Sequence, residues 1–420
     1  MMARLLFSII LFFYLYAFSL AVLPILSTRI ILGLIGFIYI VFNLYQNLSQ
    51  GKLLINRRVL YVSLALILIF SVSFFSIIYN KTNDYEFIKF SLSMFIGFLS
   101  ATSIYKIAGY LGIRKDEYTL ITCLIIAILL QCSISLAMYF SPYISDTINS
   151  VIHMSELSII KQEALQGLRI IGFSRSYFSA GIYCGMGLLL IAYLIRYYTQ
   201  DRKQILLLVI SYIFIFIVGM MMARTTLIGM AFSILLLIAP TSIRNLIHPS
   251  KRKLKFLTLL IAIPMMIVHI FLLFFPSFLQ KIDPLIQFAF ELFFNLIQEN
   301  SLETRSTNSM LNMYKFPDNL KTWLIGDAMW SLDGGTEYYM HTDIGYSRLL
   351  FYFGVLGLVI FIGYQLVLIK MSLNKKLALI LLSLYFLILN LKGFADLSNF
   401  LILILIFRIH AEKVNFIQQK

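Results

Sequence analysis

The chain has 420 residues, of which 60% are hydrophobic and only 13% are charged. A soluble domain carries roughly 25% charged residues, so the composition excludes that class. Apolar runs long enough to cross a hydrocarbon core of about 30 Å recur along the sequence, and their continuity excludes a β-barrel, whose strands alternate in polarity. The sequence therefore predicts an all-α, polytopic helical bundle in a membrane.

The net charge of +15 does not indicate a nucleic-acid partner, because the basic residues lie mostly between the apolar runs. An excess of lysine and arginine in short connections marks the cytoplasmic side of a membrane protein. The three cysteines, Cys123, Cys132 and Cys184, lie within apolar segments. Their spacing fits neither a zinc site nor a disulfide framework.

The apolar runs predict about twelve transmembrane helices in one integral membrane domain, residues 1–420. They lie near residues 5–23, 30–47, 59–79, 87–105, 118–140, 176–198, 205–223, 225–242, 256–275, 345–369, 377–391 and 397–409. The first run follows Arg4 and resembles a signal peptide, but its length and the span close behind it favour an uncleaved helix.

Charge fixes the orientation that we predict. With a cytoplasmic N-terminus, the inner segments hold 21 of the 34 basic residues but only four of the 19 acidic ones. The reverse orientation would invert this strong bias. We therefore expect both termini in the cytoplasm.

Two outer segments are long, at residues 141–175 and 276–343. No inner segment has the glycine-rich phosphate loop of a nucleotide-powered pump, so we expect any chemistry to face outward. Within the second segment, "DPLIQFAFELFFNLIQEN" (Asp283–Asn300) is aromatic-rich, interrupted by Glu291 and too short to span. It predicts a helix that either lies on the membrane surface or packs against the bundle.

Arg224 stands alone in "GMMMARTTLIGM", at the outer turn between two uncharged spans. A charge near a membrane is costly, so a functional site is a reasonable hypothesis, although a snorkelling anchor fits as well. The two threonines and the free N–H groups at the start of the next helix would favour an anion. We predict that Arg224 binds an anionic ligand.

Further arginines precede the sixth span, in "GLRIIGFSRSYFSAG". Arg169 and Arg175 lie on the predicted outer side among serines, and guanidinium groups bind phosphate oxygens in a bidentate manner. Ordinary juxtamembrane arginines are the alternative. Three arginines on one membrane face favour a phosphate or diphosphate site.

The second long segment ends in "GGTEYYMHTDIGYSRLLFYFGVLG", which contains His341, Asp343 and Arg348. A histidine two residues from an aspartate suits a general base with its orienting partner, or two unrelated hydrogen bonds. Tyr338 and Tyr339 suit stacking on a sugar or an interfacial aromatic belt. Metal binding has little support, since the outer segments offer only His153 besides His341.

These motifs together resemble the O-antigen polymerase family of Gram-negative inner membranes, which is related to the O-antigen ligases. The resemblance rests on "GLRIIGFSRS" before a span, "ART" opening a later span, and a long outer loop ending in "HTDIGYSRLLFYFGVLG". The architecture covers the whole chain, whereas the motifs cover about 50 residues.

The resemblance implies a glycosyltransferase that joins undecaprenyl-diphosphate-linked glycans at the periplasmic face, by inverting, metal-independent transfer without a cofactor. It assigns the diphosphate to Arg169 and Arg224, with Arg175 and Arg348 as weaker additions. His341 lies near the reacting groups, with Asp343 as an alternative base. A chain-length regulator and a flippase of the same pathway are the implied protein partners.

One departure from the family concerns its pattern of an arginine, ten residues and a glycine. Counting onward from Arg169, Arg175 and Arg305 reaches Ala180, Met186 and Phe316 instead. The alternatives are an O-antigen ligase, or a lipid-linked oligosaccharide flippase or other transporter. A flippase would be expected to carry charges inside its spans and to have shorter outer loops.

Overall fold

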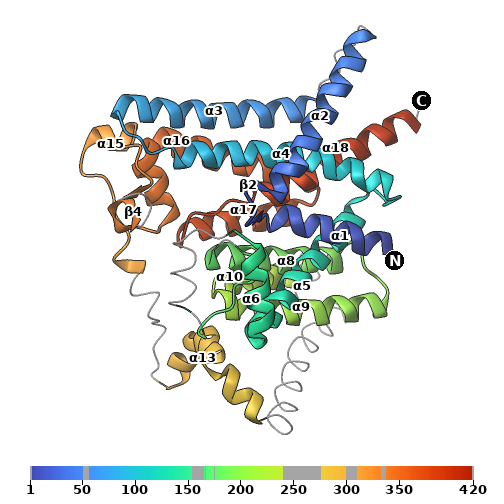
Figure 1. Ribbon diagram of the computed structural model, residues 1–420, viewed down its shortest axis with the longest axis vertical. Helices are drawn as coiled ribbons and strands as arrows, with labels where there is room; N and C mark the ends of the chain where they lie inside the picture. The colour runs from blue at the N-terminus through green and yellow to red at the C-terminus, as the bar shows by residue number, and fades with distance from the viewer. Residues whose placement is uncertain are drawn as a thin grey trace. The chain divides into compact units, whose positions relative to one another are not determined.

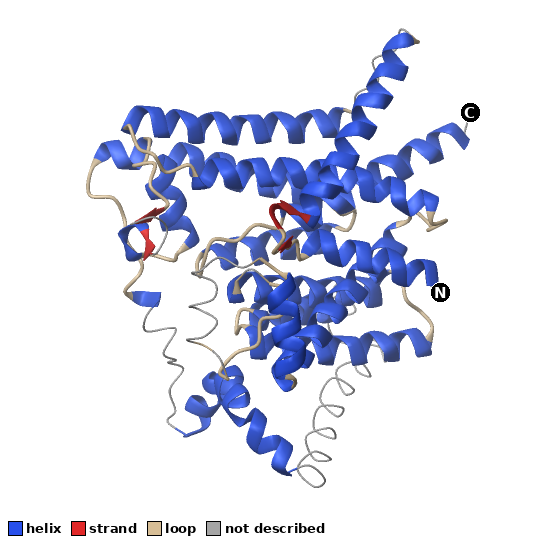
Figure 2. Ribbon diagram, in the orientation of Figure 1, coloured by secondary structure: helices blue, strands red, loops and turns tan. Residues whose placement is uncertain are grey.

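The computed structural model describes residues 2–50, 56–153, 165, 167–174, 176–239, 276–298, 310–332 and 337–418. Helices make up most of these residues, accompanied by two short antiparallel strand pairs (Figure 2). Within these described ranges, seven helices are long and apolar enough to cross a membrane, and four apolar helices are shorter. The predicted helical membrane bundle is therefore confirmed in class. The predicted span at 256–275 lies outside the described residues.

The chain divides into two compact units, Met1–Cys123 with Arg305–Lys420, and Leu124–Thr304. In the first unit, α3 (Arg57–Asn80), α4 (Glu86–Tyr110) and α16 (Gly345–Ser372) run side by side (Figure 1). The other elements of this unit are α1 (Met2–Leu15), β1 (Ser19–Leu20), β2 (Leu23–Ser27), α2 (Thr28–Ser49), α15 (Leu320–Leu324), β3 (Ser331–Leu332), β4 (Glu337–Tyr338), the 3₁₀ turn η2 (Tyr339–His341), α17 (Lys376–Asn390) and α18 (Ser398–Gln418).

The second unit holds most of α5 (Glu117–Phe140), with α6 (Pro142–Val151), α8 (Tyr177–Tyr197), α9 (Arg202–Met222), α10 (Thr226–Ile238) and α13 (Pro276–Gln298). Helix α8 is buried on nearly every side from Ala180 to Ile195, as a helix that is apolar all round should be. It crosses α10 by backbone contact, because a Cβ on Gly229 would lie 2.2 Å from the Cα of Gly185. Close helix crossings in membranes require small residues.

Polar side chains start many of these helices. Ser27, Asn56, Ser141, Ser176 and Asp201 each precede a helix and accept a hydrogen bond from an amide of its first turn. Such caps satisfy N–H groups that have no partner inside the helix. The polar residues that precede the apolar runs therefore mark where these helices start.

Arginines cap three helix ends. Arg29 donates to the carbonyls of Tyr14 and Leu15 at the end of α1, with bonds of 2.7 to 3.0 Å. Arg196 donates to the carbonyls of Leu236 and Ala239 at the C-terminal end of α10, and Arg408 to those of Met371 and Leu373 at the C-terminal end of α16. A cation at a helix C-terminus opposes the negative end of the helix dipole.

The first predicted span, 5–23, is wrong in extent. Helix α1 ends at Leu15 after 14 residues, and the chain then forms the β1–β2 hairpin. The carbonyls left at the end of α1 are satisfied by Arg29, which folds back from the start of α2. The apolar run 5–23 therefore continues beyond the end of α1, because that end depends on Arg29, which lies outside the run.

Candidate functional site

Two arginines meet on one aromatic ring in the second unit. Arg224 lies in the turn between α9 and α10, and Arg169 lies in the segment that precedes α8. The guanidinium carbon of Arg169 is 4.2 Å from the centroid of the Phe288 ring, and that of Arg224 is 4.7 Å from the same centroid. Phe288 belongs to α13, which packs against α9. The ring thus gathers two cations from segments far apart in the sequence.

Helix α13 also provides a carboxylate. Glu291 Oε2 lies 2.7 Å from Arg224 NH1, and the two side chains are only 21% and 12% exposed. Phe290, between Phe288 and Glu291, departs from helical geometry with φ −110° and ψ 16°. The helix predicted for Asp283–Asn300 is confirmed, beginning earlier at Pro276, and its bend lies between the two residues that contact the arginines.

The segment that carries Arg169 is anchored by a buried glutamine of α5. Gln131 Nε2 donates to the Ile171 carbonyl at 2.9 Å and to Ser174 Oγ at 3.2 Å, while its Oε1 accepts from the Phe173 amide. Gly172 has φ +60°, and a Cβ there would lie 2.1 Å from Ser135 Oγ. Only glycine fits this approach without a clash.

Arg169 is itself short of partners. The described residues supply no hydrogen-bond partner for its buried Nε. Burial lowers its pKa first, and the nearby charge of Arg224 lowers the pKa further, while Tyr177 and Glu291 oppose the shift only in part. The first two effects disfavour the charged guanidinium, so an anion bound here would relieve them. The ring of Tyr177, 5.4 Å from the guanidinium carbon, covers another side of the group.

The start of α10 does not provide the free amides that the sequence suggested. The amides of Thr226, Leu227 and Ile228 donate to the carbonyls of Ala223, Arg224 and Thr225. Anion affinity at this turn therefore depends on the guanidinium groups. The buried hydroxyl of Thr226 has no hydrogen-bond partner among the described residues.

A second cluster lies in the first unit, around Arg348 in the first turns of α16. Its guanidinium carbon is 3.7 Å from the ring centroid of Trp330 and 3.9 Å from that of Tyr338. Arg348 is 7% exposed, and its NH1 lies 3.7 Å from Asp343 Oδ1. The described residues offer no hydrogen-bond partner for its Nε and NH2.

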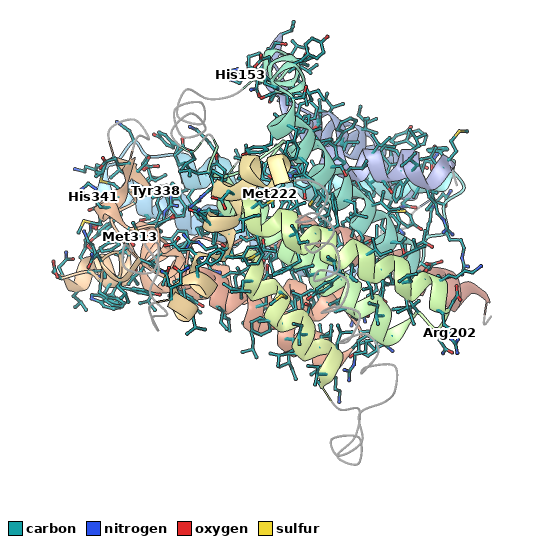
Figure 3. All side chains as sticks on the ribbon, turned by 90° about the horizontal axis from the view of Figure 1, so that it is seen from below. His153, Arg202, Met222, Met313, Tyr338 and His341 are labelled. Atoms are coloured by element: carbon teal, nitrogen blue, oxygen red, sulfur yellow. The ribbon has the colours of Figure 1, made fainter. Side chains whose placement is uncertain are left out.

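His341 is exposed at 66%, and its Nδ1 lies 2.9 Å from Glu337 Oε2. The sequence suggested Asp343 as its orienting carboxylate, but Glu337 occupies that place and Asp343 faces Arg348. Both Met340 and His341 have positive φ, at 56° and 52°, which for side chains other than glycine costs about 1–2 kcal/mol each. Figure 3 shows Tyr338 and His341 close together, with Met313 nearby.

Tyr339 belongs to the support of this turn. Its hydroxyl donates to Asp327 Oδ2 at 3.2 Å, and Asp327 also accepts from Lys321 Nζ and Thr322 Oγ1. Burial and then the Asp327 charge raise the pKa of Tyr339, which keeps it a hydrogen-bond donor. The ring of Tyr338 covers Arg348, and Tyr338 is 37% exposed.

The predicted residues thus separate into two groups. Arg169 and Arg224 come together in one unit, and Arg348, Asp343 and His341 lie in the other. Arg175 lies outside the described residues. His153 follows α6 and lies apart from Met222, at the end of α9 (Figure 3). The described residues contain no group of three or more His, Cys, Asp or Glu side chains that could hold a metal ion.

The sequence did not predict the contacts that Phe288, Glu291, Gln131 and Trp330 make with the candidate residues and their segments. A carboxylate inside an aromatic-rich helix and a glutamine inside a span were the available signals, because both are costly without a partner. No family model matches this chain, and neither do curated proteins or solved structures.

Proposed function

We propose that this chain is an O-antigen polymerase of the bacterial inner membrane. It joins undecaprenyl-diphosphate-linked repeat units at the periplasmic face by inverting, metal-independent glycosyl transfer. The observation that supports this proposal best is the meeting of Arg169 and Arg224 on Phe288, where the Arg224 side chain is only 12% exposed. With Glu291, the cluster holds two positive charges and one negative charge, and such a surplus suits a diphosphate.

The reaction needs a stabilised leaving group. The bond from the anomeric carbon to the diphosphate oxygen breaks, and the electron pair leaves with the diphosphate. A hydroxyl of the second glycan attacks the anomeric carbon, and a base takes its proton. Fixed guanidinium groups in a site of low dielectric stabilise the developing negative charge. No nucleotide is consumed, because the lipid-linked donor is already activated.

His341 is the proposed base, since histidine is the side chain that most often transfers protons in enzyme active sites. The 2.9 Å contact to Glu337 would fix the ring, and the exposure of His341 leaves Nε2 available to a hydroxyl. Asp343 is the alternative base, at 45% exposure. Arg348 remains a weaker candidate for the diphosphate.

A transporter of lipid-linked oligosaccharide is the second candidate, and one observation favours it. Gln365, fully buried in α16, donates to Asp396 Oδ1 at 2.5 Å, so an acidic group is held against a predicted span. Charges at membrane depth often mark a transport pathway. The middles of the predicted spans are nearly free of charge, and the predicted outer segment 276–343 is long. Both features fit an enzyme better than a transporter, and we therefore place the polymerase first.

Deleting the gene distinguishes the three proposed functions, polymerase, ligase and flippase. Loss of a polymerase should leave lipid A-core with a single repeat unit. Loss of a ligase should leave the core bare while polymer accumulates on undecaprenyl. Loss of a flippase should trap single units at the cytoplasmic face, which would reject the enzyme.

Complementation of that strain tests the site. Arg224→Ala and Arg169→Ala should insert normally but lower polymer formation about a hundredfold or more, the typical cost of losing a group that stabilises a developing anion. Arg114→Ala is the matched control, because Arg114 is 81% exposed and pairs with Asp116 outside this cluster. Wild-type ladders on gels from the Arg224→Ala strain would remove that residue from the site.

A further inference from the structure

We infer that Glu291 is a built-in competitor for the anion site: its carboxylate holds Arg224 when no ligand is present and gives way to a diphosphate. This inference rests on the proposed function and adds to it a role for the second long loop. Glu291 is a positioning residue here, since it acts through Arg224 and not on the reacting atoms.

The geometry places the carboxylate where a ligand oxygen would bind. A distance of 2.7 Å to Arg224 NH1 is that of a charge-assisted hydrogen bond, which is also the distance a phosphate oxygen would take. Both side chains are largely buried, so an unpaired Arg224 would be costly. Glu291 removes this cost while the site is empty.

Arg169 shows that the carboxylate does not complete the site. The Nε of Arg169 has no hydrogen-bond partner among the described residues, although Arg169 and Arg224 both contact the ring of Phe288. The Glu291 carboxylate hydrogen-bonds Arg224, and its charge also acts on Arg169, but it leaves the Arg169 Nε without a hydrogen bond from the described residues, whereas a diphosphate offers oxygens to both guanidinium groups. A doubly esterified diphosphate carries two negative charges and would balance the two arginines, which Glu291 alone does not.

The position of Glu291 on α13 suits an exchange. On the N-terminal side of Glu291, Pro284 interrupts the backbone hydrogen bonds of α13, because proline has no N–H. Phe290, directly before Glu291, departs from helical angles. The turn that carries the carboxylate is therefore set apart from the regular helix. Its movement away from Arg224 would leave Phe288 to keep contact with the guanidinium groups.

The first test measures affinity in the purified full chain in detergent, by titration calorimetry with inorganic pyrophosphate and with geranylgeranyl diphosphate. Glu291→Gln keeps the shape but removes the competing charge, so both probes should bind about fivefold more tightly than to wild type. Glu86→Gln is the matched control, since it breaks another 2.7 Å ion pair, with Lys89, and should leave both affinities unchanged.

The outcomes distinguish the two proposals. If the probes bind wild type and lose binding in Arg224→Ala, but Glu291→Gln binds no more tightly, the competitor role is overturned and the anion site survives. If neither probe distinguishes wild type from Arg224→Ala, the anion site falls, and the proposed function loses its main support.

A second measurement needs no variant, in case Glu291→Gln does not fold. Hydrogen exchange of the wild-type chain should become faster around Glu291 in α13 when pyrophosphate is added, because the contact to Arg224 is released. Slower or unchanged exchange there, with pyrophosphate bound, would contradict the exchange of carboxylate for ligand.

Discussion

Aromatic rings surround the buried arginines in each unit, and this determines what the arginines can do. A ring face attracts a cation by about 0.5–2 kcal/mol, but it accepts no strong hydrogen bond. Arg348 between Trp330 and Tyr338 therefore keeps N–H groups without partners among the described residues, as does Arg169 beside Phe288. Such groups are positioned by packing and still able to bind an anion.

At the same scale, His341 leads to a direct prediction. His341→Ala should lower polymer formation about 100- to 10,000-fold, the usual contribution of a general base, while single repeat units still reach lipid A-core. Glu337→Gln should have a smaller effect in the same direction, because it only loosens the ring. Chain-length ladders from complemented deletion strains measure both.

His153→Ala provides the control, since His153 follows α6 in the other unit and should leave the ladder unchanged. Normal polymer from His341→Ala would assign the histidine a structural role. Asp343→Asn would then become the decisive variant for the base.

The sequence predicted candidate site residues more readily than the residues that contact them. Arg169 and Arg224 stand out as candidates in the sequence because charged residues beside apolar spans are costly. Their partners Phe288 and Glu291 lie in α13 and are related to them only by the fold. Of the two alternatives for His341 and Asp343, separate partners fit the structure: the imidazole contacts Glu337 from a turn with positive φ at Met340 and His341, and Asp343 faces Arg348.

Among the elements, α16 shows how a span can be interrupted without exposing backbone. Phe353 and Gly354 depart from helical angles, and Gly354 has φ +67°. The freed carbonyls of Phe351 and Tyr352 accept from the amides of Asp327 and Ala328. Broken helices persist in membranes only where other protein groups satisfy them. Here that support comes from the loop that also carries Trp330.

Gly354→Ala should destabilise the protein by at least about 2 kcal/mol, since φ +67° is unfavourable for alanine. Its Cβ would also lie 2.3 Å from the backbone of Leu324. Gly363→Ala is the control in the same helix, with nothing within 4 Å of its Cβ, and should be neutral or stabilise by about 0.5–1 kcal/mol. Thermal unfolding in detergent compares the two. Equal melting temperatures would contradict this account of the break.

Apolar runs predicted where helices lie better than where they are interrupted. The run containing α16 was predicted as one span, 345–369, because glycine is common in membrane helices and nothing in the run marks Gly354 as special. The same limit applies to α1, whose end depends on Arg29. Helix starts were easier, since residues such as Asn56 and Asp201 mark them locally.

For the whole molecule, the distribution of charge predicts the orientation in the membrane. Ile170 donates its amide to the Met221 carbonyl, so the segment carrying Arg169 adjoins the end of α9 opposite to Arg202 (Figure 3). The basic residues near Arg202 predict a cytoplasmic location for that end. The arginine pair should then face the periplasm, as the proposed reaction requires.

Labelling with a membrane-impermeant maleimide tests this orientation within the second unit. Leu168→Cys, at a side chain 47% exposed, should react in intact spheroplasts, whereas Tyr198→Cys, at 39% exposure, should react only after the membrane is permeabilised. The native Cys123, Cys132 and Cys184 are buried and should give little background. Reaction of Tyr198→Cys in intact spheroplasts, with Leu168→Cys protected, would place the arginine pair in the cytoplasm. A periplasmic polymerase would then be excluded, because the donor glycan would never reach the pair.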